Sequence, residues 1–191
     1  VRLGGPPQGR QAAAVLELDR DGERPAAGAT GVDFGRAVGM VVGQVARIKG
    51  CRAVGIAGGQ QKCDWLVNEL GFDAAVDYKA GAVFKTLKAA APKGINVYFD
   101  NVGGDILEAC LFQMNNGGRV ACCGAISAYD GAAPAAGPRG VPGLIVVKRL
   151  TLKGFIVTDF FGERDKAIAD LQSWVEAGKI KVEEDVIETA D

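Results

Sequence analysis

Short apolar runs rich in β-branched residues alternate with amphipathic stretches along the chain from Ala37 onward. The apolar runs are CRAVGIAG, DAAVDY, INVYFDNVGG, GGRVACCGAIS and RLTLKGFIV. The helical patterns are RAVGMVVGQVARIKG, QQKCDWLVNELG, AVFKTLKAAAPKG, DILEACLFQM and, after the last strand, RDKAIADLQSWVEAGKI. Parallel strands that are apolar on both faces need crossover helices between them. The alternation therefore predicts an α/β domain with a parallel sheet.

About five strands and about five helices are typical of a Rossmann-type doubly wound parallel sheet. The chain has 191 residues, which is enough for one well-buried core and marginal for two. We predict one such domain over residues 37–191, with AYDGAAPAAGPRGVPG as a long loop inside it. Residues 1–36 fit this pattern poorly, because they are rich in Gly, Ala, Arg and Pro and only AAAVLELDR offers a short helical pattern.

A glycine-rich stretch, GATGVDFGRAVGMVVGQVARIKG, opens the first helical pattern. Without Val32–Arg36 it would read Gly-Ala-Thr-Gly-Ala-Val-Gly and run directly into a helix. Glycine turns at a helix N-terminus bind the pyrophosphate of a dinucleotide through backbone N–H groups. Gly31 and Ala37–Gly39 are therefore candidate cofactor-binding residues. The alternative is a glycine-rich turn whose glycines only allow close helix packing.

The end of the following strand indicates which dinucleotide would bind. NAD sites usually place a carboxylate there, on the adenosine ribose hydroxyls. Here the strand ends GIAGGQQK, with small residues at Gly58 and Gly59 and a cation at Lys62. This end leaves room for a 2′-phosphate and supplies its countercharge, so it predicts NADP rather than NAD. The alternative is that Lys62 is a solvated lysine at a helix start.

Composition excludes several other classes of function. The chain has no histidine, which removes Ser-His and Cys-His catalytic pairs and most catalytic zinc sites. The net charge is −1 and no dense Lys/Arg run occurs, so we expect no nucleic-acid partner. The five cysteines form neither an even disulfide framework nor a paired Cys-x-x-Cys metal pattern, and we expect no metal. No apolar run is long enough to span a bilayer, which predicts a cytoplasmic protein without a membrane partner.

Four longer motifs follow one another in the chain: GIAGGQQKCDWLVNELGFDAAVDYK, VYFDNVGGDIL, CCGAISAYD and KRLTLKGFIVTDF. Together they strongly resemble the zinc-independent medium-chain dehydrogenase/reductases, in particular the branch of leukotriene/prostaglandin reductases and alkenal double-bond reductases. The resemblance runs from about Ala37 to the C-terminus. It implies an oxidoreductase that uses NADPH, without metal, to reduce the C=C bond of α,β-unsaturated aldehydes and ketones.

The resemblance also implies roles for individual residues. Lys62 and Tyr78 are similar to the pair that grips the 2′-phosphate. Asn101 would lie beside the ribose and nicotinamide of the cofactor. Cys123, Gly124 and Ile126 resemble the strand end under the nicotinamide, and Phe155, Ile156 and Val157 resemble the loop that borders it.

Tyr129 resembles the tyrosine proposed to act near the nicotinamide ribose and the substrate oxygen. Hydride delivery to the β-carbon of an enone builds negative charge on that oxygen, and a phenol can stabilise it by hydrogen bonding. The alternative is a loop tyrosine that merely covers the cofactor. Asp100 and Asp130 could be proposed as acids, but an aspartate before a Gly-Gly turn more often caps backbone N–H groups.

The chain departs from the family in two respects. It matches only the cofactor lobe, so the substrate-binding lobe, and with it most of the enone pocket, is missing. Family members also place a strongly β-branched strand before the glycine loop, where this chain has GERPAAGATG. Three explanations are open for residues 1–36: a genuine insertion, an artefact in the sequence, or wrongly assigned residues. The abrupt recovery of the resemblance after VDFGR favours the artefact.

Two other functions remain open. One is a quinone oxidoreductase of the same superfamily, and the other is a non-catalytic dinucleotide-binding module. Family members often dimerise by joining the sheets of their cofactor lobes edge to edge. The LTLKGFIV strand is apolar enough to form such an edge, so we expect a homodimer through the cofactor-lobe sheet.

Overall fold

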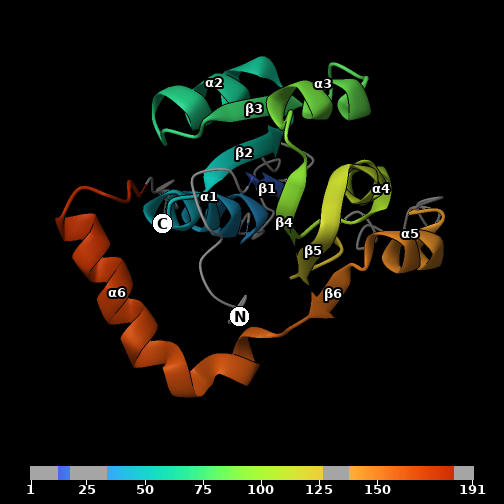
Figure 1. Ribbon diagram of the computed structural model, residues 1–191. Helices are drawn as coiled ribbons and strands as arrows, with labels where there is room; N and C mark the ends of the chain where they lie inside the picture. Colours follow the sequence, from blue (N-terminus) through green and yellow to red (C-terminus); the bar gives the residue numbers. More distant parts are fainter. Residues whose placement is uncertain (1–12, 18–33, 127–137, 183–191) are drawn as a thin grey trace, which may run out of the picture.

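The computed structural model describes residues 13–17, 34–126 and 138–182. Their strands form one sheet in the order β3-β2-β1-β4-β5-β6, and every neighbouring pair is parallel (Figure 1). The strands are β1 (Ala13–Glu17), β2 (Arg52–Ala57), β3 (Ala74–Asp77), β4 (Ile95–Asp100), β5 (Met114–Cys122) and β6 (Thr151–Gly154). This is the predicted Rossmann-type doubly wound sheet, and its strand order reverses between β1 and β4.

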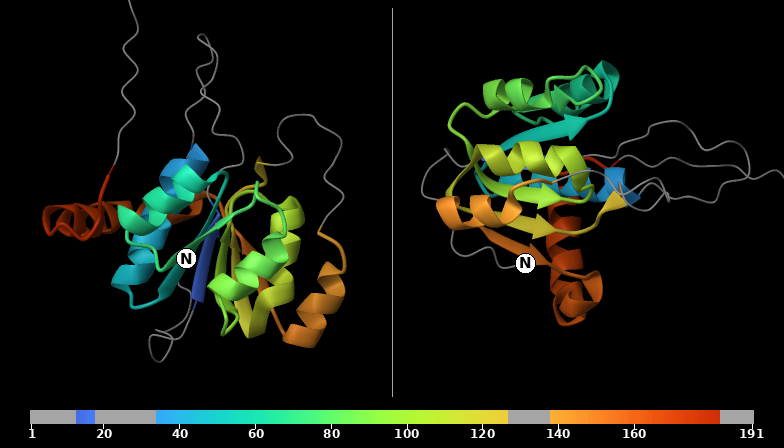
Figure 2. Two further views of the ribbon diagram at one scale, coloured as in Figure 1. Left: turned by 90° about the horizontal axis from the view of Figure 1, so that it is seen from above. Right: turned by 90° about the vertical axis from the view of Figure 1, so that its right-hand side faces the viewer.

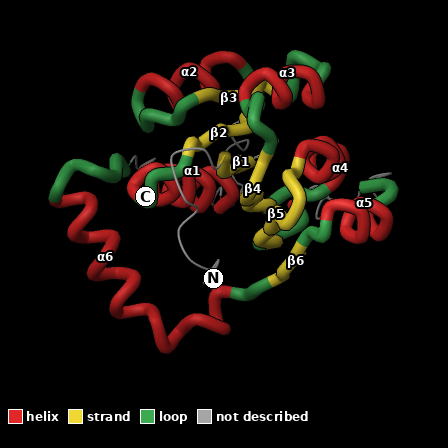
Figure 3. Tube along the Cα trace, in the orientation of Figure 1, coloured by secondary structure: helices red, strands yellow, loops and turns green. Residues whose placement is uncertain are grey.

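Helices cover both faces of the sheet (Figures 1 and 2). One face carries α1 (Phe34–Ile48) and α2 (Gln60–Asn68). The other face carries α3 (Val83–Ala90), α4 (Gly104–Gln113) and α5 (Val141–Lys148). After β6 the chain forms a 3₁₀ segment, η2 (Val157–Glu163), and then α6 (Arg164–Glu176). The tube in Figure 3 shows α6 standing away from the sheet, on the side of α1.

Each layer has its own apolar core. On the α3/α4/α5 face the core includes Val54, Leu87, Ile95, Cys110 and Leu111, all fully buried. On the α1/α2 face a second core gathers around the rings of Phe72 and Phe99 and the side chains of Met40 and Leu66. The strand β2 is thus buried on both faces, which explains why it reads as an almost continuous apolar run.

Two expectations about secondary structure are wrong. AAAVLELDR was expected to be helical, but Ala13–Glu17 is the strand β1. It pairs with both β2 and β4, so its backbone groups have partners on both sides, and this tertiary pairing overrides local helix propensity. The expected loop through Gly143 also ends earlier, because α5 begins at Val141 with a proline in its first turn.

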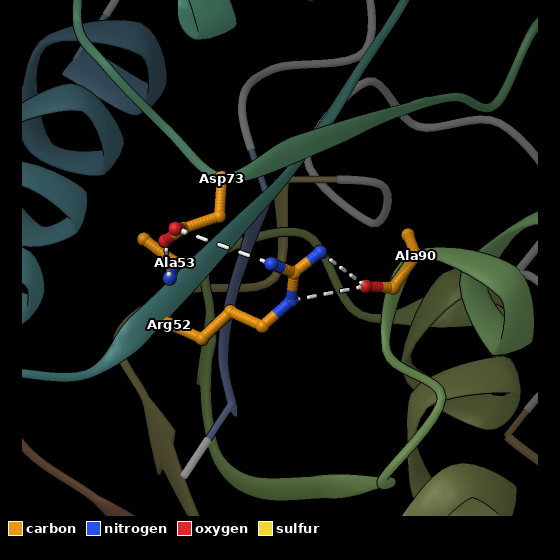
Figure 4. Close-up of polar contacts among 4 residues, drawn as sticks. All are labelled: Arg52, Ala53, Asp73 and Ala90. Carbon is orange, nitrogen blue, oxygen red and sulfur yellow. Dashed lines mark hydrogen bonds and ion pairs between the residues drawn. The ribbon is translucent and has the colours of Figure 1, made fainter. Parts of the chain in front are cut away.

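A polar cluster ties together the edge of the sheet where β2 begins (Figure 4). Arg52 donates from Nη2 and Nε to the Ala90 carbonyl at 3.1 and 3.4 Å. Asp73 Oδ2 accepts the Ala53 N–H at 2.8 Å, and its Oδ1 lies 4.0 Å from Arg52 Nη1. The cluster therefore fixes the start of β2 against the approach to β3 and the end of α3.

A hollow of about 450 Å³ lies beside this cluster, lined by Arg47, Gly50, Cys51, Arg52 and Asp73. It is at the amino-terminal edge of the parallel strands, whereas ligands of doubly wound sheets bind beyond the carboxyl ends. The hollow is therefore not part of the candidate cofactor site. Within the described ranges, no helix has both the length and the apolar character needed to cross a membrane.

Candidate functional site

The predicted site residues gather at the carboxyl edge of the sheet in two groups, one on each side of β1. One group follows β2 and β3, and the other follows β4, β5 and β6. The point where the strand order reverses lies between the two groups. In doubly wound sheets this is where a dinucleotide lies extended across the strand ends.

The first group begins in the turn after β2. Gly58 and Gly59 connect the strand to α2, and Lys62 is the third residue of that helix. Gly59 has φ 101° and ψ 145°, a conformation that side chains rarely allow. The helix has no side-chain cap, so its first turn leaves backbone N–H groups available beside a lysine.

Tyr78 approaches this turn from the end of β3. Its backbone N–H donates to the Ala57 carbonyl at 3.1 Å. A methyl group at Gly58 would lie 2.7 Å from the Tyr78 hydroxyl oxygen and 3.0 Å from Lys79 Cε. The structure therefore brings the predicted Tyr78 directly over Gly58, and a glycine is required there for this close approach.

The second group begins at the end of β4, where Asp100 is buried. Its Oδ1 accepts N–H groups from Gly103 at 2.9 Å and Val102 at 3.3 Å, and the Tyr98 hydroxyl lies 3.1 Å away. Asp100 thus caps the turn before α4, as the sequence predicted. Burial is the main cause that raises the pKa of its carboxyl, against these hydrogen bonds, which lower it. Asn101 beside it is also buried.

Backbone hydrogen bonds join Asp100 and Asn101 to the other predicted residues of this group. Cys123 N–H donates to the Asp100 carbonyl at 2.7 Å, and Ile126 N–H donates to the Asn101 carbonyl at 3.1 Å. Gly124 lies between these two bonds in the chain. The strand ends predicted to lie under the nicotinamide are therefore fixed to each other.

Phe155 follows β6 and closes the other side of this group. Its N–H donates to the Cys122 carbonyl at 3.3 Å, and its ring lies 6.3 Å from that of Phe99 and 6.0 Å from that of Phe160. Aromatic pairs at such distances add to apolar burial. Ile156 and Val157, predicted to border the nicotinamide with Phe155, are 66% and 70% exposed.

Of the remaining predicted residues, those that the structure describes lie in α1. The helix begins at Phe34, so Ala37 ends its first turn and Val38 and Gly39 lie in the second. Three residues of the suspected insertion Val32–Arg36, namely Phe34 to Arg36, are thus helical. Gly31 and Tyr129 lie outside the described residues, and so does Asp130.

Burial raises the pKa of three thiols at or near this edge. Burial, aided by the charge of Asp100, raises the pKa of Cys122 and of Cys123. Burial, with Asp77 and Asp64, raises the pKa of Cys63 to about 11. Because the thiolate is the nucleophile, these cysteines are suited to packing rather than to covalent chemistry. Over residues 13–17, 34–126 and 138–182, no group of three or more His, Cys, Asp or Glu side chains could hold a metal ion.

Sequence reasoning missed one residue of the first group. Asp77 Oδ1 accepts N–H groups from Gly59 at 2.8 Å and from Lys79 at 2.9 Å. A carboxylate therefore does lie beside the Gly58–Lys62 turn, although it comes from β3 and not from β2. The signal available in the sequence was an aspartate at the end of a predicted strand, DAAVDY, next to Tyr78.

Comparisons with known proteins agree with this arrangement. The family model for zinc-binding dehydrogenases matches residues 37–173. Prostaglandin reductase 1 of Bos taurus is 47% identical over 154 residues, which cover 80% of this chain and 46% of that protein. The NADPH-dependent curcumin reductase of Escherichia coli (strain K12) is 38% identical over 153 residues, which cover 78% of this chain and 44% of that protein.

Among solved structures, CurA from Vibrio vulnificus in complex with NADPH superposes with a TM-score of 0.78 and 34% sequence identity. The match covers 94% of this chain and 50% of that one. The chain therefore spans about half the length of the relatives it matches, and its fold corresponds to one lobe of them. On the family match and these identities, the chain belongs to the zinc-binding dehydrogenase family of medium-chain dehydrogenase/reductases.

Proposed function

We propose that this chain is the NADP(H)-binding lobe of an oxidoreductase that reduces the C=C bond of α,β-unsaturated aldehydes and ketones. The observation that carries the proposal is the turn after β2, where Gly58 lies under the Tyr78 hydroxyl at the start of the helix that bears Lys62. Support comes from relatives named as prostaglandin and curcumin reductases, and from the NADPH complex of CurA.

The residues at this turn fit a 2′-phosphorylated ribose. A side chain at Gly58 would displace Tyr78, so the position of the Tyr78 hydroxyl at this turn depends on a glycine there. Lys62 supplies a positive charge and Tyr78 a hydroxyl donor, which are the groups that a phosphate monoester binds. The carboxylate of Asp77 at this turn already accepts two backbone N–H groups.

NADPH, when bound, supplies the hydride. In this proposal the chain itself holds and orients the nicotinamide: Asn101, Cys123, Gly124 and Ile126 form the surface beneath it, and Phe155 borders it. Ala37–Gly39, with Gly31, would bind the pyrophosphate near the start of α1. Tyr129 would donate a hydrogen bond to the substrate oxygen as negative charge develops there.

Substrate turnover needs the half of the enzyme that this chain does not match. A direct test is a chimera in which residues 37–173 replace the matching segment of bovine prostaglandin reductase 1. We expect the chimera to oxidise NADPH only when an enone, such as a 2-alkenal, is added. A folded chimera that binds NADPH without enone-dependent turnover would contradict the reductase proposal and favour a non-catalytic binding module.

Two further parts of the proposal concern assembly and location. β6 is an edge strand of the sheet, and the exposed side chains of Ile156 and Val157 follow it directly. Pairing with the same edge of a second copy would cover both, which supports a homodimer. None of the five cysteines forms a disulfide, and this supports the reducing environment of the cytoplasm.

A further inference from the structure

Asp77, the last residue of β3, joins two loops through a single oxygen atom. Its Oδ1 accepts the N–H of Gly59, in the turn after β2, and the N–H of Lys79, in the turn after β3. Both distances are below 3.0 Å, in the range of good N–H···O bonds to a carboxylate. The position of one turn relative to the other therefore depends on this side chain.

The two turns carry the groups proposed to contact the 2′-phosphate. Gly59 caps the helix that bears Lys62, so the Gly59 peptide sets where the first turn of α2 begins. Tyr78 lies between Asp77 and Lys79, and its own N–H is bonded to Ala57. Gly59 has a backbone conformation with few steric restraints, so it needs an external hydrogen bond to stay in one orientation.

Electrostatics and positioning predict opposite effects of Asp77 on anion binding. A carboxylate beside a phosphate site repels the phosphate, so removing its charge would tighten NADPH binding if charge were all that mattered. If the carboxylate instead holds Gly59 and Lys79, removing it would release both turns and weaken NADPH binding. The direction of the change thus separates the two effects.

We propose that Asp77 is a positioning residue that holds the Gly58–Lys62 turn against Tyr78 and thereby sets the preference for NADPH over NADH. The inference rests on the proposed function, since it assumes that this edge binds NADP(H). Asp77 makes no contact with the cofactor in this scheme. Its effect passes through the backbone of Gly59 and Lys79.

The experiment compares Asp77→Ala, which removes the acceptor, with Asp77→Asn, which keeps an acceptor oxygen and removes the charge. Asp64→Ala is the matched control, because Asp64 is an exposed carboxylate of the same helix start that accepts a hydrogen bond from the Gln60 side chain at 2.7 Å. Kd values for NADPH and NADH are measured by nicotinamide fluorescence. Amide hydrogen exchange of Gly59 and Lys79 is followed by NMR without cofactor.

We expect Asp77→Ala to raise the Kd for NADPH by about tenfold, the equivalent of one charge-assisted hydrogen bond, and to leave the Kd for NADH unchanged. It should also speed amide exchange at Gly59 and Lys79. Asp77→Asn should keep the Kd for NADPH and the amide exchange rates of the unmodified chain. Asp64→Ala should change neither quantity by more than about twofold. If Asp77→Ala fails to fold, Asp77→Ser, whose hydroxyl is too short to reach both amides, takes its place with the same expectation.

Three outcomes would overturn the inference. The first is that Asp77→Ala binds NADPH as tightly as the unmodified chain, or more tightly. The second is that Asp77→Ala weakens the binding of NADPH and NADH equally. The third is that Asp77→Asn binds NADPH as weakly as Asp77→Ala does. An unmodified chain that binds neither dinucleotide, or both equally, would contradict the proposed function and the inference together. In that case the amide exchange of Gly59 and Lys79 would still report whether Asp77 holds the two turns.

Discussion

Asp100 shows how one side chain organises the second half of the candidate site. Its carboxylate accepts N–H groups from Gly103 and Val102, while its backbone carbonyl accepts from Cys123, directly after the neighbouring strand β5. The capping role follows from the sequence, because an aspartate before Gly-Gly is a common turn former. The bond to Cys123 does not, since it depends on the register between β4 and β5.

The raised pKa of Asp100 predicts a pH effect on stability. The folded chain holds this proton more tightly than the unfolded chain, so the contribution of Asp100 falls as pH rises from the ordinary carboxyl pKa of 3.8 through the folded pKa. Asp100→Asn keeps an acceptor and removes the titration. We expect the stability of this variant, relative to the parent, to increase between about pH 4 and pH 7.

Urea unfolding of both proteins at the two pH values measures this difference. Comparing variant with parent cancels the titration of all other carboxylates. A relative stability that stays constant or falls with rising pH would show that the hydrogen bonds from Gly103 and Val102, and not burial, dominate the pKa of Asp100.

Lys62 is the residue on which cofactor preference depends most directly. Lys62→Ala removes the proposed charge opposite the 2′-phosphate, and a charge-assisted hydrogen bond contributes about 1.5–3 kcal/mol. We therefore expect the Kd for NADPH to rise about tenfold to a hundredfold, with NADH unaffected. Lys85→Ala, at an exposed lysine of α3, makes the same charge change elsewhere and should have no effect. Equal effects of the two variants would refute a specific role for Lys62.

At the scale of elements, the strands and helices with clear apolar periodicity were predicted correctly. β2, β3, β4, β5 and β6 each coincide with a predicted apolar run, and the signal is strongest in β2, where five of the six residues are buried. β1 and α5 were not predicted. AAVLE consists mostly of good helix formers and becomes a strand through pairing on both sides. VPGLIVVK is apolar without helical periodicity.

In the candidate site, too, some residues could be predicted from the sequence and others could not. Gly58, Lys62 and Tyr78 could be found from the sequence, because they belong to motifs whose spacing is local. The role of Asp77 could not, since its partner Gly59 lies 18 residues away and reaches it only through the pairing of β2 with β3. Contacts between the ends of neighbouring strands require the register, and the sequence pattern does not specify it.

The packing of α1 on the sheet provides a test at this scale. Gly43 of α1 lies against the buried ring of Phe72, in the connection between α2 and β3, and a Cβ at Gly43 would clash with this ring. Phe72 is enclosed by the core of the α1/α2 face and has little room to move. We expect Gly43→Ala to lower the free energy of unfolding by about 1–3 kcal/mol, the usual cost of overpacking.

Thermal or urea unfolding measures the effect of Gly43→Ala. Gly162→Ala is a suitable control, because a Cβ at that position meets nothing within 4 Å. If Gly43→Ala were as stable as the parent, α1 could not lie as close to Phe72 as the structure shows.

At the scale of the whole molecule, the exposed edge at β6 predicts self-association. The Phe155 N–H points toward β5, so the N–H of Gly154, one residue earlier, faces the free edge. Gly154→Pro would remove this donor, whereas Gly154→Ala keeps it and meets nothing within 4 Å. We expect a dimer by analytical ultracentrifugation at micromolar concentration, retained in the alanine variant and lost in the proline variant. A monomeric parent chain would contradict the proposed homodimer.

The central claim is that the carboxyl edge of this sheet binds NADP(H), and a direct titration of the chain with NADPH and NADH tests it. Binding is followed by the fluorescence of Trp65, in α2, and of Trp174, in α6, together with that of the nicotinamide. The account predicts saturable binding of NADPH with a Kd at least about tenfold below that for NADH. Equal binding of the two dinucleotides, or binding of neither, would contradict it.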